Sequence, residues 1–180
     1  MTANSCTCFP HTHHAYWRFD FDVEGPSNAI YEIPLQSGLT AGVPISTERK
    51  LFRSDTKPMH YRIRGPKRSY LLYPGENDGN ADKYRKGDIW FLHWHDGTDP
   101  VSVEIDDGHS FSDATSADLD QFLTGEPLKK EDIVVWYHAS FLLPPAMTWE
   151  TIIRLRPKAR RLTQMGEREV VGPDLVPVGY

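Results

Sequence analysis

Apolar and polar residues alternate most clearly near the N-terminus, from His13 to Glu24. Successive side chains of a β-strand point to opposite faces of its sheet. The alternation therefore predicts a strand over about 13–24 with one apolar face and one solvated face. The apolar set, headed by His11 and His13, is Ala15, Trp17, Phe19, Phe21 and Val23; the polar set is His14, Tyr16, Arg18, Asp20 and Asp22.

Further strand patterns follow along the chain, separated by turn residues. The runs 88–95 and 133–141 are apolar enough for buried strands, and the turn at Gly25-Pro26 favours a hairpin between 13–24 and 29–35. An all-β, mostly antiparallel β-sandwich is the fold that these patterns predict. Weaker strands are expected at 50–53, 61–64, 68–73, 151–155 and 169–176, a loop at 36–50, and one short helix at 116–123.

Composition agrees with one sheet-rich domain. The chain has 180 residues, of which 12% are aromatic, and aromatic residues favour strands. We expect an irregular N-terminal arm at 1–12 and a single β-sandwich domain at 13–180. A net charge of −5 gives no basic surface for nucleic acid. The chain has no apolar run long enough to cross a membrane and no signal-peptide core at its start, which predicts a cytoplasmic protein.

Two His-x-His pairs are the candidate metal ligands. His11 and His13 share a strand face, so both imidazoles can reach one transition-metal ion; the equally weighted alternative is a half-buried strand with two incidental histidines. His93 and His95 form the second pair and share strand parity with Phe91, so they could be buried. For them, hydrogen-bonded structural histidines are the favoured interpretation over ligands.

Cys6 and Cys8 are the only cysteines. Two residues apart, they are poorly placed for an ordinary disulfide with each other. Plain thiols are the favoured interpretation, and a redox pair or soft ligands beside His11 and His13 are the alternatives.

Two stretches resemble copper amine oxidases. The first is His11-Thr12-His13 followed by Arg18-Phe19-Asp20-Phe21-Asp22, which is similar to the copper-ligand strand of that family. The second is Phe-Leu-Thr-Gly-Glu-Pro-Leu at 122–128, followed by Glu-Asp-Ile-Val-Val-Trp-Tyr at 131–137. The order of the two stretches is that of the family. The resemblance implies the C-terminal part of a large catalytic β-sandwich domain.

The resemblance also implies a mononuclear copper site with three imidazoles. His11 and His13 match two of them, and the position of the third is occupied by Leu143, which cannot bind copper. His138 lies nearby in sequence, but it has the opposite strand parity to Leu143 and would need a bulge to reach the same ion. Other replacements to consider are His93, His95, Cys6, Cys8 and water.

A second cation site is implied by the same family. Asp20, Phe21, Asp22, Asp132 and Ile133 match its peripheral site, which uses carboxylate and carbonyl oxygens. Oxygen-only ligands favour calcium or a similar hard ion. The equally weighted alternative is a set of acidic strand ends without an ion.

The redox cofactor of the family, topaquinone, is made from a tyrosine well upstream of His-x-His. Only ten residues precede His11, and none of them is a tyrosine or the family's catalytic aspartate. We therefore expect no topaquinone and no self-contained amine oxidation. Either a second polypeptide supplies the missing part, or the chain is a reduced relative.

Three functions follow. The first is a metal-binding β-sandwich protein related to these oxidases, with copper as the expected metal, either redox-active itself or one part of a multi-chain oxidase. The second is a non-catalytic interaction module that has lost the copper centre, and the third is a zinc site that activates water for hydrolysis. A homodimer, or a second chain that covers the sheet edges, is expected by analogy with the dimeric family.

Overall fold

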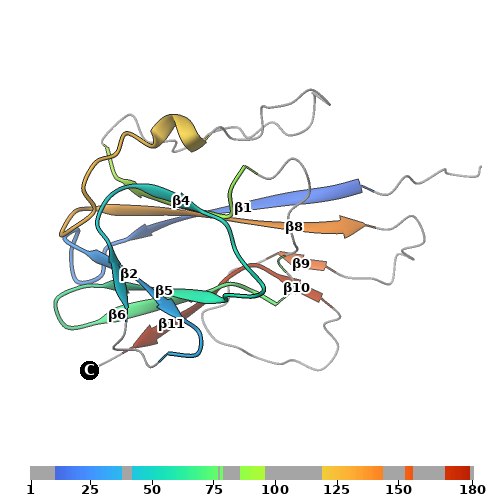
Figure 1. The fold of residues 1–180 in the computed structure, drawn as a ribbon, viewed down its shortest axis with the longest axis horizontal. Coiled ribbons are helices and arrows are strands. Elements are labelled where there is room, and N and C mark those ends of the chain that lie inside the picture. The colour runs from blue at the N-terminus through green and yellow to red at the C-terminus, as the bar shows by residue number, and fades with distance from the viewer. Residues whose placement is uncertain are drawn as a thin grey trace, which may run out of the picture.

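Two antiparallel sheets build the molecule (Figure 1), in a computed structural model that describes residues 11–37, 42–76, 78, 86–95, 119–143, 153–155 and 169–178. One sheet has the strand order β1-β8-β7-β4, the other β11-β6-β5-β2-β3, and β9 and β10 form a separate parallel pair. The predicted all-β sandwich is confirmed. The strands are β1 His11–Phe21, β2 Ala29–Pro34, β3 Val43–Ile45, β4 Arg49–Leu51, β5 Met59–Arg64, β6 Ser69–Tyr73, β7 Ile89–His93, β8 Ile133–Leu143, β9 Ile153–Leu155, β10 Glu169–Val171 and β11 Asp174–Val178.

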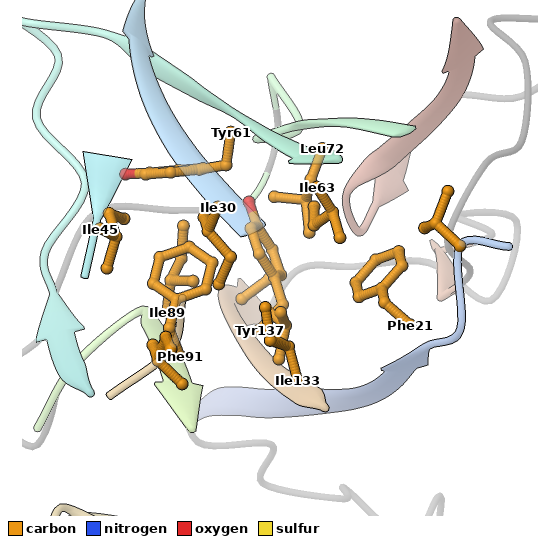
Figure 2. Packing of buried hydrophobic residues seen from close by; sticks show 14 residues of the cluster. Phe21, Ile30, Ile45, Tyr61, Ile63, Leu72, Ile89, Phe91, Ile133 and Tyr137 are labelled. Carbon is orange, nitrogen blue, oxygen red and sulfur yellow. The ribbon is translucent and has the colours of Figure 1, made fainter. Parts of the chain in front are cut away.

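The main core lies between the two sheets (Figure 2). Alternate positions of the first sheet, including Phe21, Phe91 and Tyr137, pack against Ile30 and Ile63 of the second. Full burial of one such side chain stabilises the fold by about 1.5–3 kcal/mol. The apolar face predicted for the first strand is the face that enters this core, as the burial of Phe21 shows.

A smaller core covers the outer face of the first sheet. Trp90 and Trp136 pack there beneath a 3₁₀ helix, η1 (Leu119–Phe122), whose Leu119 is fully buried. Asp120 fastens this helix, because its carboxylate accepts hydrogen bonds from Lys50 Nζ and Trp90 Nε1. The expected helix is confirmed only over these four residues; the preceding part of 116–123 lies outside the described residues. No helix in the described ranges is long and apolar enough to span a membrane.

The predicted hairpin between the first two strands is wrong. β1 pairs with β8, whereas β2 pairs with β3 and β5 of the other sheet. The chain changes sheets at Glu24 and Gly25, whose φ angles are 60° and 122°. The Asn28 side chain donates to the Gly25 carbonyl at 2.6 Å, and Asn28 then bridges to Glu131. These contacts make a corner of the sandwich, so the two strands leave it in different layers.

Two stretches of the chain differ from the strands predicted from the sequence. β3 lies within the stretch expected to be a loop, and Pro44 sits in it opposite Tyr31. Proline cannot donate a ladder hydrogen bond, which is tolerated on an edge strand but weakens the strand signal in the sequence. The single strand expected at 169–176 is two strands, separated at Gly172, where φ is 130°.

Candidate metal centre

Three side chains from two distant segments converge at one end of the first sheet. His93 is the last residue of β7, His95 follows two residues later, and Glu126 lies in the loop between η1 and β8. One nitrogen or oxygen of each residue lies within 4.8 Å of those of the other two. Within the described ranges, this is the one group of three or more histidine, cysteine or acidic side chains that meets this distance. It is therefore the best candidate for an ion site.

The positions of the ligand atoms suit a transition metal. His93 Nδ1 and His95 Nε2 lie 3.4 Å apart, and His95 Nε2 lies 2.7 Å from Glu126 Oε2. The ring centroids are 4.8 Å apart with planes inclined by 64°, so the two rings meet edge-on. Tetrahedral ligands at a metal–nitrogen distance of about 2.1 Å are about 3.4 Å from one another. The two imidazoles already have this spacing.

The electrostatics keep the carboxylate of Glu126 ionised. The hydrogen bond from Thr124 Oγ1, 2.8 Å long, lowers the pKa of Glu126, and the neighbouring His95 and His93 lower the pKa further. A metal ligand must be deprotonated, so a lowered pKa favours binding. In the ion-free arrangement, a proton on His95 Nε2 is donated to the same carboxylate.

A second carboxylate lies beside the group. Glu131 Oε2 is 3.5 Å from His93 Nε2, on the ring nitrogen that does not face His95. Metal-bound histidines commonly donate their other N–H to a carboxylate, which fixes the ring orientation. Glu131 is in the right place for this function. His93 and His95 are half-exposed, so the expectation from parity that they could be buried is not met.

The histidine pair on the outer face of the first sheet has a different geometry. His14 Nδ1 and His138 Nε2 are 2.9 Å apart, the ring planes are inclined by only 15°, and the centroids are 5.1 Å apart. These values describe an in-line N–H···N hydrogen bond. His138 Nδ1 lies 3.1 Å from the Gly87 carbonyl, to which it donates, so its Nε2 is the acceptor for His14. The pair is a part-buried structural contact, with Tyr16 stacked on His138 at a centroid distance of 4.6 Å.

A pocket of about 400 Å³ is lined by residues of β2, β5 and β6 and of the segment 52–58, and by none of these histidines. Two of its lining residues, Arg53 and Asp78, belong to an ionic network in which Arg53 contacts Asp78, Asp88 and the Tyr137 hydroxyl. Asp78 also accepts the amides of Gly75 and Gly172. Both carboxylates are fully buried, which the pairing with Arg53 makes tolerable.

Comparison with known proteins identifies solved structures that share this fold. No family model and no curated protein sequence matches the chain. Among solved structures, the Aspergillus nidulans amine oxidase superposes with a TM-score of 0.53 at 19% identity, and the Pichia pastoris lysyl oxidase with 0.53 at 15%. Each match covers 74% of this chain and 23% of the other. This chain has the fold of part of the copper amine oxidases.

The likeness is one of fold, and it covers only part of each matched oxidase. A copper-containing benzylamine oxidase from Hansenula polymorpha matches over 93% of the chain at 13% identity, with a TM-score of 0.44. The chain spans about a quarter of the length of the amine oxidases that it matches. The expected relation to the oxidase β-sandwich is thus confirmed for the architecture.

The copper-type positions of the amine oxidase motif lie at the start of β1. His11 stands opposite Leu143 and His13 opposite Phe141 in the β1–β8 ladder; the side chains of these four residues lie outside what the structure describes. His138 stands opposite Tyr16, in the set of positions that alternates with His11 and His13. Its contact with His14 disfavours it as their third ligand. Copper binding by His11 and His13 stays a prediction.

The calcium-type positions of the motif do come together. Phe21 stands opposite Ile133 in the ladder, so Asp20, Asp22 and Asp132 gather at that end of β1 and β8. Burial raises the pKa of Asp132, and the carboxylates of Asp22 and Asp20 raise the pKa further. Asp132 Oδ1 is buried without a hydrogen-bond partner. The ligand atoms of the three aspartates are farther apart than those of the histidine–glutamate group, and calcium stays a prediction.

Proposed function

We propose that this chain is a metal-binding β-sandwich protein whose centre is formed by His93, His95 and Glu126. The observation that supports the proposal is the 3.4 Å spacing of the two imidazole nitrogens, with the ionised carboxylate 2.7 Å from one of them. Two imidazoles and one carboxylate leave a fourth position for water or a substrate, as in catalytic metal sites.

Copper(II) is the first candidate for the ion. Nitrogen and oxygen sites bind copper(II) more tightly than the other divalent ions of the first transition row. Copper with an open coordination position would make the chain redox-active, either alone or as one part of a multi-chain oxidase. The oxidase-like fold supports this assignment. The motif at His11 and His13 would then be a second copper-binding position.

Zinc is the second candidate, because two histidines and one glutamate also form a common catalytic zinc set. Zinc would lower the pKa of its bound water and support hydrolysis. A protein that binds neither metal would be the non-catalytic interaction module.

Two further properties belong to the proposal. A calcium ion at Asp20, Asp22 and Asp132, with the Phe21 and Ile133 carbonyls, would relieve the mutual repulsion of three carboxylates. A homodimer or a second chain would cover the sheet edges at β1 and β4.

Metal analysis tests the function. Protein purified without added metal is assayed for copper and zinc, and is then titrated with copper(II) while the type-2 electron paramagnetic resonance (EPR) spectrum is followed. The double variant His93→Ala/His95→Ala should lose the tightest site, whereas His11→Ala/His13→Ala should keep it. Glu126→Gln should weaken binding and Glu24→Gln, a surface carboxylate in another turn, should not. Equal affinity in wild type and His93→Ala/His95→Ala would refute the assignment.

A further inference from the structure

One buried carboxylate connects the two segments that supply the candidate ligands. Glu48, between β3 and β4, is only 7% exposed. Its Oε1 accepts the amide of His93 at 2.9 Å, and its Oε2 accepts the amide of Thr124 at 2.7 Å. Oε2 also accepts the amides of Gly125 and Glu126 at 3.0 and 3.3 Å, and Thr124 Oγ1 lies 2.9 Å from it. The same side chain therefore holds the end of β7 and the loop that carries Glu126.

The backbone around Glu48 holds the same loop. The amide of Glu48 donates to the Glu126 carbonyl at 2.9 Å, and the amide of Leu128 donates to the Ser46 carbonyl at 2.9 Å. Glu126 is thus fixed on both sides of its α-carbon, through its amide and through its carbonyl.

The conformation of Gly125 allows the Glu48 carboxylate to accept these hydrogen bonds. Its φ of +84° lies in the left-handed region, which glycine adopts readily and other residues seldom do. The amides of three successive residues, 124–126, consequently turn toward one oxygen, as in the anion-binding nests formed by alternating backbone conformations.

From these contacts we infer that Glu48 is a positioning residue of the metal centre: it prearranges His93 and Glu126, which are far apart in sequence, for one ion. The inference rests on the proposed function. Thr124 extends the arrangement, because its hydroxyl contacts both Glu48 Oε2 and Glu126 Oε2. Residues that orient metal ligands typically change metal affinity 10- to 100-fold when they are replaced.

The experiment compares Glu48→Gln with Glu24→Gln, using copper(II) and zinc(II) as separate probes. Glutamine keeps the size of the side chain but places an NH₂ group against backbone donors. Glu24 is the matched control, because it too accepts two backbone amides, those of Lys67 and Arg68 at 2.6 and 2.8 Å, in a different turn. Dissociation constants are measured on folded protein, together with the copper EPR spectrum and the thermal midpoint without metal.

We expect the dissociation constant of Glu48→Gln to rise about 10- to 100-fold, with a shifted or heterogeneous EPR spectrum, and that of Glu24→Gln to stay within about twofold. An unchanged dissociation constant and spectrum in folded Glu48→Gln would overturn the inference and leave the metal site in place. Wild type that binds no metal at His93 and His95 would overturn both. If Glu48→Gln does not fold, Glu48→Asp, whose shorter side chain cannot span both segments, takes its place: a dissociation constant several-fold higher supports the inference, and an unchanged one overturns it.

Discussion

His11 and Leu143 stand directly opposite each other in the antiparallel ladder of β1 and β8. The amine oxidase motif implies a third histidine at the position of Leu143, and the backbone register pairs that position with the first histidine of His-x-His. Opposite residues of antiparallel strands are the nearest cross-strand neighbours. The ladder therefore places position 143 next to His11 in the backbone, which is where the motif implies the third histidine.

Restoring the third imidazole should strengthen copper binding at this end of the ladder. In a His93→Ala/His95→Ala background, Leu143→His is expected to lower the dissociation constant for copper(II) at least about tenfold, because a third ligand is added to two. The measurement is a copper titration monitored by EPR.

Leu142→His is the matched control for this substitution. Leu142 stands opposite Thr12, in the alternate set of positions. A gain of affinity that is equal for both variants would show that the added histidine does not act with His11 and His13.

The carboxylate of Glu126 should make the free energy of unfolding depend on pH at values below the ordinary pKa of glutamate. Its pKa in the folded protein is lowered from 4.5, mainly by the hydrogen bond from Thr124. The ionised form therefore stabilises the folded state above pH 4.5, and this contribution is lost as the pH falls through the lowered pKa. Glu126→Gln should flatten the decline of the unfolding free energy below pH 4.5. Urea unfolding across this range measures it, and a decline as steep as in wild type would contradict the expectation.

Asp132→Asn should stabilise the protein when no cation is added. The pKa of Asp132 is raised by burial and by Asp22 and Asp20, so its ionised form costs stability at neutral pH, and the cost disappears as the pH falls through the raised pKa. We expect a thermal midpoint higher by roughly 1–3 °C and no further increase with calcium. Wild type should gain stability from calcium. A calcium-dependent increase of the same size in Asp132→Asn would exclude this residue as a ligand.

Tyr137→Phe tests the ionic network of Arg53, Asp78 and Asp88. The hydroxyl donates to Asp78 and lies 3.3 Å from Arg53 Nη1, and the side chain is fully buried. Its removal takes a partner from a buried carboxylate and should lower the unfolding free energy by about 1–3 kcal/mol. Tyr70→Phe, at an exposed residue of β6, should change it by less than about 0.5 kcal/mol. Chemical denaturation of both variants gives the comparison.

Local pattern in the sequence was sufficient for the fold class and for the faces of the strands. The alternation around Phe21 identifies the side that enters the core, since strand parity depends on neighbouring residues alone. The two stretches similar to copper amine oxidases carried the relation that the superposed structures confirm at the level of fold. The resemblance also grouped Phe21 and Ile133 in one implied cation site, and these two residues are paired in the ladder of β1 and β8.

Tertiary structure decided which strands pair and which histidines lie beside a carboxylate from a distant segment. The corner at Glu24 and Gly25 sends the chain into the second sheet, and a hairpin signal cannot distinguish such a corner from a turn. Glu126 lies beside His95 in a loop from a distant part of the chain, which hydrogen bonds from the Glu48 side chain and from the backbone at 46–48 hold in place. Convergence of this kind depends on long-range hydrogen bonds and on one left-handed glycine, Gly125, whereas strand spacing depends only on neighbours in sequence. That difference is why the pair His93 and His95 looked structural in the sequence and is a candidate metal centre in the folded chain.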